Sequence, residues 1–206
     1  MKRPLIAAAA VFLAQVSPSL ADDGLYQDVA DPNSSFVRVV APGQTVASIN
    51  GESVRDIASG VSDYVNVMPG EIDVVLPNGT GVVEVGPSAY YTVLFTDDGQ
   101  TEVITDDITN SPSKADISVY NLTDTPGIDV FVPQANAVAL EGIEAMQGQS
   151  IAIKAPLTLD FELRTGDEVL ATVSQVDLVR NAGVSIVLLQ TDDGYSAFAT
   201  ENSYLK

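Results

Sequence analysis

The sequence predicts an all-β fold made of two tandem antiparallel β-sandwich domains joined by a short linker. Two observations carry this prediction. Short runs of β-branched and other apolar residues recur along the chain, each bounded by Gly, Pro, Asn or Asp. The turn Thr-Asp-Asp-Gly follows a continuous apolar run at 96–99 and again at 191–194. A turn repeated at the same place in the pattern indicates two related domains.

The first 21 residues have the pattern of a secretory signal peptide. Lys2 and Arg3 precede an apolar run over 5–16, and the small-residue site Ser-Leu-Ala at 19–21 precedes Asp22. The run is about a dozen residues long, short of the ~20 that a membrane-spanning helix needs. We therefore expect export, cleavage after residue 21 and a soluble periplasmic chain.

The remaining sequence divides at a short polar segment. Asn-Ser-Pro-Ser at 110–113 interrupts the apolar pattern with residues that favour turns and extended chain. We expect an N-terminal β-sandwich domain over 22–108, a linker over 109–115 and a C-terminal β-sandwich domain over 116–206.

The expected strands follow from alternation and from turn residues. In the first domain they are 36–40, 45–49, 52–57, 63–67, 72–76, 82–85, 90–95 and 101–105. Asn50-Gly51 suits the positive φ angles of a type I′ hairpin. In the second domain a strand at 116–120 comes first, and a hairpin of 184–190 with 195–200 comes last. The Ala-rich stretch 135–147 fits one short helix or an irregular loop.

The charge of the chain is strongly acidic. It has 28 Asp and Glu against 9 Lys and Arg, a formal net charge of −19. Such a surface repels phosphate backbones, anionic lipids and uronic-acid polymers, so we expect no nucleic-acid partner. Basic proteins and cations are favoured partners, although solubility or adaptation to salt would explain the same charge.

The composition excludes the usual catalytic groups. The chain has no histidine and no cysteine, so it contains no imidazole base, no thiolate nucleophile and no disulfide. Three lysines follow the leader, Lys114, Lys154 and Lys206, and none lies in a recognisable serine-lysine motif. We therefore predict no catalytic residue, no cofactor and no metal site, and a protein that is not an enzyme.

Carboxylate doublets and aromatic residues leave two alternatives open. The doublets at 97–98, 106–107 and 192–193 fit turns, with calcium binding as the alternative, although no complete EF-hand loop is present. Tyr90, Tyr91, Tyr120 and Tyr195 could bind sugar from a sheet face, or could belong to the core. Arg38 lies between two valines, where it either serves an interface or points outward beside an acidic neighbour.

Several short motifs resemble the AlgF family of alginate O-acetylation proteins, in the order of that family. They are Leu25-Tyr26, Ser-Ser-Phe-Val-Arg-Val at 34–39, Met-Pro-Gly at 68–70, Tyr-Tyr-Thr-Val at 90–93, Asn-Leu-Thr-Asp at 121–124, and the stretch 156–167 with Leu170-Ala171. They span nearly the whole exported chain, and none is a catalytic signature. The sequence departs from the family after Val39, where Val-Ala-Pro replaces a Tyr-Asn-type continuation.

The resemblance implies a periplasmic, non-catalytic adaptor in exopolysaccharide O-acetylation. Its implied partners are a membrane-bound acyltransferase and periplasmic O-acetyltransferases. The polymer is alginate by family default or another exopolysaccharide, and direct binding of polysaccharide, as by a carbohydrate-binding module, is the alternative role. As partner-binding residues we predict Leu25, Tyr26, Phe36, Arg38 and Tyr91.

Overall fold

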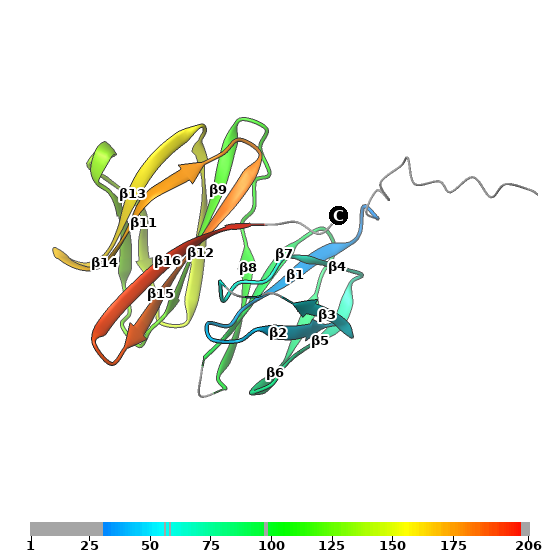
Figure 1. Ribbon diagram of the computed structural model, residues 1–206. Coiled ribbons are helices and arrows are strands. Elements are labelled where there is room, and N and C mark those ends of the chain that lie inside the picture. The colour runs from blue at the N-terminus through cyan, green and yellow to red at the C-terminus, as the bar shows by residue number, and fades with distance from the viewer. Residues whose placement is uncertain (1–30, 56, 58, 97–98, 203–206) are drawn as a thin grey trace, which may run out of the picture.

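Strands make up most of the protein (Figure 1). The computed structural model describes residues 31–55, 57, 59–96 and 99–202. The strands of this part of the chain form four sheets of four strands each. The predicted all-β class is therefore confirmed. The expected signal peptide, Leu25, Tyr26 and the doublet at 97–98 lie outside the described residues. Within them, no helix has the length and apolar character to cross a bilayer.

The first half of the described chain contains strands β1 to β8. Their bounds are Ser35–Val40, Val46–Ile49, Glu52–Arg55, Val65–Val67, Gly70–Leu76, Gly79–Val85, Tyr90–Phe95 and Thr101–Asp106. They form two sheets, β4-β1-β7-β8 and β3-β2-β5-β6. The alternate apolar side chains of both sheets, mostly Val and Ile, enclose one core.

The second half contains strands β9 to β16. Their bounds are Lys114–Leu122, Ile128–Val132, Ala137–Ile143, Gln147–Lys154, Leu157–Thr165, Glu168–Leu178, Ala182–Thr191 and Gly194–Asn202. Its sheets are β12-β9-β15-β16 and β11-β10-β13-β14, around a second core. Since β8 ends at Asp106 and β9 begins at Lys114, the chain crosses between the halves over 107–113.

The two halves share one topology. Adding eight to each strand number of the first half reproduces both sheet orders of the second half. In each half the first strand runs parallel to the seventh, β1 beside β7 and β9 beside β15. This identity confirms the tandem plan that the repeated Thr-Asp-Asp-Gly turn predicted.

The Asn50-Gly51 hairpin is also confirmed. Ile49 of β2 pairs with Glu52 of β3, which leaves a two-residue turn. Asn50 and Gly51 both have positive φ angles, 51° and 79°, as a type I′ turn requires. The Gly at this position therefore fixes the register of the hairpin.

The stretch 135–147 is neither a helix nor an irregular loop, so both expectations were wrong. Most of it is β11, and the one helical element in the described part is the 3-10 turn Pro133–Ala135. Leu140 and Ile143 are both buried because a register shift opposes Val130 to Leu140 and Ile128 to Ile143. This bulge puts two residues three positions apart into one core, and that spacing imitates a helix.

One sheet of each half faces the other half. We call these two sheets, β4-β1-β7-β8 and β12-β9-β15-β16, the inner sheets (Figure 1). The central strands of the inner sheets are buried on both faces, which explains their nearly continuous apolar sequences. The contact between the inner sheets is called the seam below.

Candidate functional site at the seam between the two halves

The seam has an apolar layer of its own, separate from the two domain cores. Val40, Leu94 and Ile104 of the first half pack in one buried cluster with Tyr120 and Val187 of the second half. Partly buried apolar side chains extend the cluster: Leu122, Met146, Leu189 and Phe198. Burial of this apolar layer stabilises the association of the two halves.

Arg38 is the polar centre of the seam and is fully buried. Its guanidinium donates through Nε to Thr92 Oγ1 at 2.9 Å, within the first half. Its Nη2 donates to the Tyr120 hydroxyl at 2.6 Å, and its Nη1 donates to Asn202 Oδ1 at 2.7 Å, both in the second half. One side chain thereby ties β1 to β7, β9 and β16.

The negative partner of this site is Asp106, the last residue of β8. The hydroxyls of Thr92 and Tyr120 donate to its carboxylate oxygens at 2.5 and 2.6 Å, and the Tyr64 hydroxyl donates at 3.0 Å. Thr92 and Tyr120 therefore accept from Arg38 and donate to Asp106. The hydroxyls of Thr92 and Tyr120 thus bridge a buried cation and a buried carboxylate, while the Asn202 Nδ2 group is buried without a hydrogen-bond partner among the described residues.

Aromatic rings cover the guanidinium. The Arg38 Cζ lies 4.2 Å from the centroid of the Tyr64 ring and 5.4 Å from that of Tyr120. A cation held over ring faces in a desolvated site is stabilised by the ring quadrupole. The rings thus replace part of the hydration that Arg38 loses.

Burial and neighbouring charges shift the pKa values of Arg38, Tyr64 and Tyr120. Burial raises the pKa of Tyr64 and of Tyr120 well above that of a free tyrosine. For Arg38, burial acts to lower the pKa, but Tyr120, Tyr64 and Asp106 more than offset it and the pKa is raised. The phenols stay protonated and the guanidinium stays charged, so none of these groups is suited to act as a general base near pH 7.

We expect the raised tyrosine pKa values to make the fold sensitive to alkali. Above pH ~10 an unfolded tyrosine loses its proton while the buried phenols keep theirs, so stability falls as pH rises. Each such tyrosine contributes up to about 1.4 kcal/mol per pH unit. Urea unfolding between pH 8 and 11 measures the slope, and Tyr64→Phe should flatten it. An unchanged slope in that variant would contradict the assignment.

Gly148 makes room for the Tyr120 ring. The two residues are cross-strand partners on β12 and β9, and a Cβ at Gly148 would lie 2.5 and 2.7 Å from ring carbons of Tyr120. We expect Gly148→Ala to displace the ring and to lower the free energy of unfolding by about 1–3 kcal/mol. The control is Gly79→Ala, where a Cβ would make ordinary contacts at 3.6 Å. Equal effects in chemical denaturation would refute the role of Gly148.

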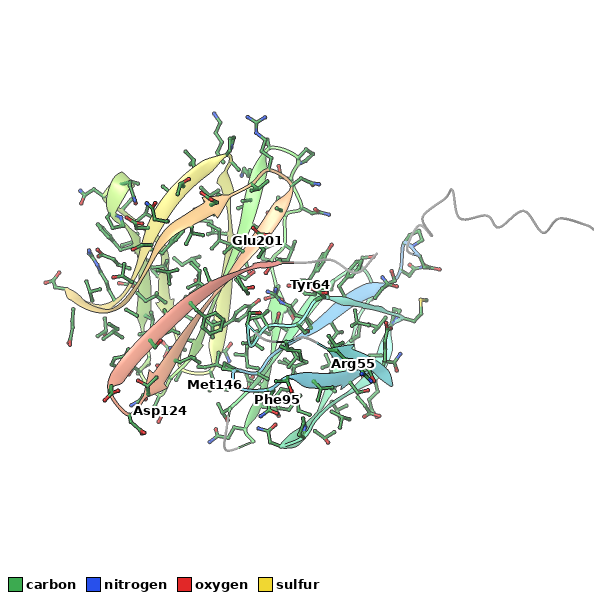
Figure 2. All side chains as sticks on the ribbon, viewed as in Figure 1. Arg55, Tyr64, Phe95, Asp124, Met146 and Glu201 are labelled. Atoms are coloured by element: carbon green, nitrogen blue, oxygen red, sulfur yellow. The ribbon has the colours of Figure 1, made fainter. Side chains whose placement is uncertain are left out.

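A cleft of about 470 Å³ opens at the seam beyond the carboxyl ends of β1, β7, β9 and β15. It is lined by Pro42, Gly43, Phe95, Thr96, Gln100, Leu122, Thr123, Asp124, Met146, Leu189, Gln190 and Thr191. Figure 2 shows Phe95 of the first half and Met146 and Asp124 of the second on this side of the molecule. The lining combines apolar side chains, such as Phe95, Leu122, Met146 and Leu189, with polar ones, and no lining residue is basic. A cavity of this size between two domains is typical of a binding site.

The first residue of each Thr-Asp-Asp-Gly turn lines this cleft. Thr96 belongs to the first Thr-Asp-Asp-Gly turn and Thr191 to the second, and both line the cavity. Asp192 and Asp193 form the exposed two-residue turn between β15 and β16, which confirms the turn interpretation of that doublet. The shared topology therefore places the equivalent residues Thr96 and Thr191 at one opening.

The predicted partner-binding residues have different surroundings. Phe36 is partly buried and stacks on Tyr90 with ring centroids 5.0 Å apart. Tyr91 packs on the core of the first half, and its hydroxyl accepts the Gly86 N–H at 3.0 Å. The outward orientation considered for Arg38 is wrong, because its side chain is fully buried. A role of these residues in binding a separate partner stays a prediction.

Sequence reasoning missed most of the seam network. Asp106 was interpreted as a turn residue, but it ends a strand and accepts three hydroxyl hydrogen bonds. Tyr120 was considered as a sugar-binding aromatic residue, yet it is fully buried. The lone arginine within Phe-Val-Arg-Val-Val was the available signal, because a buried cation requires an anionic partner. Within the described residues, no group of three or more His, Cys, Asp or Glu could hold a metal ion.

The fold and the seam define a two-domain β-sandwich protein whose halves are joined by a buried ionic network. The family model described as alginate O-acetyl transferase AlgF matches residues 8–186, so the chain belongs to the AlgF family. The chain is 27% identical to the alginate biosynthesis protein AlgF of Pseudomonas fluorescens over 199 residues, 95% of this chain and 90% of that protein. This membership confirms the resemblance and gives the protein a role in alginate O-acetylation.

Two solved structures share low similarity with the chain. A putative cell adhesion protein from Bacteroides ovatus ATCC 8483 has 10% identity and a TM-score of 0.31, covering 86% of this chain and 99% of that one. The Bacillus anthracis TIE protein has 9% identity and a TM-score of 0.24, covering 83% of this chain and 44% of that one. TM-scores of this size do not establish a common fold.

Proposed function

We propose that this protein is a non-catalytic periplasmic adaptor in alginate O-acetylation, joining a membrane-bound acyltransferase to periplasmic O-acetyltransferases. The observation that carries the proposal is the hydrogen bonding of Arg38 and Asp106 across the seam. This buried charged pair is committed to hydrogen bonds that hold the two halves together. A connector needs such a fixed arrangement, because it must present two surfaces at a constant separation.

Although the family is named for O-acetyl transfer, the chemistry of this chain favours an accessory role. Acyl transfer to a sugar hydroxyl ordinarily uses an activated nucleophile with a nearby base, most often histidine. The sequence has no histidine and no cysteine. The phenols at the seam are held protonated by burial, which raises the pKa of both. These facts favour a protein that works by contact.

Co-purification from cells that make acetylated alginate tests the adaptor. We expect the exported protein to retain both the membrane-bound acyltransferase and a periplasmic O-acetyltransferase. The exported protein purified alone, without either enzyme, should release no acetate from a chromogenic acetyl ester beyond the rate in buffer. Turnover above buffer, or loss of both enzymes from the captured material, would contradict the proposal.

The cleft supports a second candidate, a carbohydrate-binding module that holds the polymer. A cleft lined by both apolar and polar side chains suits a sugar ring carrying an acetyl group. Calorimetric titration with acetylated oligosaccharide measures the affinity of the wild-type protein and of two variants. Met146→Gln changes a residue that lines the cleft, and the control Met68→Gln changes an exposed methionine elsewhere. This role requires binding that the first variant weakens and the second does not. Absence of measurable binding would remove the candidate.

A further inference from the structure

Three exposed cations gather at one end of the second half. They are Lys114, the first residue of β9, Lys154, the last of β12, and Arg180, which follows β14. We call Lys114, Lys154 and Arg180 the basic tip. The chain has only 9 Lys and Arg in all, with a net charge of −19. Three of them in one place is therefore a strong local departure from the acidic surface.

The strand register brings the two lysines together. Lys114 and Lys154 are direct cross-strand partners in the β9–β12 pair, so both side chains leave the same face of the sheet. Directly opposite residues in an antiparallel pair have Cβ atoms about 5 Å apart. Arg180 is held beside this pair, because its Nε donates to the carbonyl of Ala155, the residue after Lys154, at 2.8 Å. The Asn181 N–H also donates to the Lys114 carbonyl at 2.9 Å.

No ion pair in the described part of the chain involves the basic tip. Like charges directly opposite each other destabilise a sheet. Asp116 is two residues along the same face of β9, but it is buried and its oxygens accept the N–H groups of Thr109 and Asn110 at 3.0 and 2.8 Å. Among the described residues the sole ion pair joins Arg164 to Glu162. Within the described residues, the repulsion between the two lysines is therefore not relieved by an ion pair.

An apolar surface adjoins these cations. Leu157 and Val179 are 47% and 54% exposed, and both line a shallow hollow of about 330 Å³. Val179 directly precedes Arg180 in the sequence. Asp177 also lines the hollow, and its carboxylate accepts the Thr158 hydroxyl at 2.6 Å. Large apolar side chains beside unpaired cations form a surface with both an apolar and a charged component. Such a surface is typical of a protein–protein contact with a charged rim.

We propose that the basic tip binds an acidic segment of a partner protein, whose carboxylates pair with the three cations while an apolar side chain covers Leu157 and Val179. This inference rests on the adaptor function proposed above. A polyuronate is a poorer occupant, because it carries charge along its whole length and would meet the acidic surface on either side of the tip. A protein segment can confine its negative charge to the tip and supply the apolar contact.

The position of the basic tip suits a connector with two different ends. Lys114 begins β9, and Leu122, which lines the seam cleft, ends it. Eight residue steps at ~3.3 Å place the two about 26 Å apart along the strand. Asp124 lines the cleft, and the exposed Asp192 and Asp193 directly follow the lining residue Thr191, so the two ends have opposite charge. Partners of opposite charge would therefore be sorted to opposite ends.

A single charge reversal tests the proposal. We expect Lys154→Glu in the full exported chain to weaken binding to the purified periplasmic O-acetyltransferase or acyltransferase about tenfold. The same variant should melt at or above the wild-type temperature, because it turns a lysine pair into a Lys–Glu pair. Weaker binding from a fold that is not destabilised identifies a binding residue. Biolayer interferometry and thermal unfolding give the two readouts.

Arg55→Glu is the matched control. Arg55 is exposed on β3 of the first half, away from the second half, and its reversal changes the net charge equally (Figure 2). We expect its affinity to stay within about twofold of wild type. Two results would contradict the binding role of the basic tip without contradicting the adaptor function. One is equal weakening of enzyme binding by both variants. The other is binding of polyuronate that Lys154→Glu abolishes while enzyme binding persists. A wild-type chain that binds neither enzyme would overturn both.

Discussion

Replacing Arg38 with methionine is expected to lower the free energy of unfolding by about 3–5 kcal/mol, because it leaves the Asp106 carboxylate buried without its cation. The substitution also removes the donors to Thr92, Tyr120 and Asn202. Urea unfolding at pH 7 measures the loss. Arg55→Met, at an exposed position, should change stability by less than about 0.5 kcal/mol.

Arg38→Lys separates charge from geometry in the same position. An ammonium keeps the positive charge but cannot reach three acceptors in the fixed plane of a guanidinium. We expect a loss smaller than that of Arg38→Met but well above that of the exposed control. A lysine variant as stable as wild type would show that charge alone matters and that the described hydrogen bonds contribute little.

Asp106→Asn is expected to have an effect of similar size, about 3–5 kcal/mol, from the opposite side of the pair. Three hydroxyls donate to the carboxylate, and an amide offers one acceptor oxygen while its NH₂ group faces donors. The buried guanidinium also loses its counter-charge. Chemical denaturation again supplies the measurement.

The double variant Arg38→Met with Asp106→Leu shows whether the two residues act as a unit. Removing both charges leaves no uncompensated ion, so the loss should be clearly smaller than the sum of the single losses. Additive losses would mean that Arg38 and Asp106 stabilise the seam independently, and would contradict the hydroxyl-bridged network.

The sequence predicted the strands well because their signals are local. Asn50-Gly51 dictated a two-residue turn, and the apolar runs 90–95 and 184–190 appear as β7 and within β15. The error at 135–147 has a specific cause, since a bulge opposite β10 changed the burial period that alternation assumes. Local patterns therefore fail where register shifts.

The seam could not be predicted in the same way, because its contacts join distant parts of the chain. Arg38 bonds to Tyr120 across 82 residues and to Asn202 across 164. Nothing in the spacing of Phe-Val-Arg-Val-Val identifies those partners. The sequence did indicate that Arg38 needs a partner, because an arginine within a strand buried on both faces requires an anion to neutralise its charge.

This arrangement links the fold to the proposed function. The apolar layer and the Arg38 network hold the two halves, which share one topology, in a fixed relative orientation. The cleft and the basic tip lie at different ends of the second half. An adaptor of this kind aligns enzymes by contact. Variants that loosen the seam should therefore impair acetylation even when each half still folds.

Intact-mass spectrometry of the protein, isolated from cells during active alginate acetylation together with the enzymes it retains, tests the central claim most directly. We expect the chain to co-purify with an acyltransferase or O-acetyltransferase and to have its unmodified mass. An acetyl group covalently bound to this chain, and passed on to the polymer in a chase, would contradict an action by contact alone.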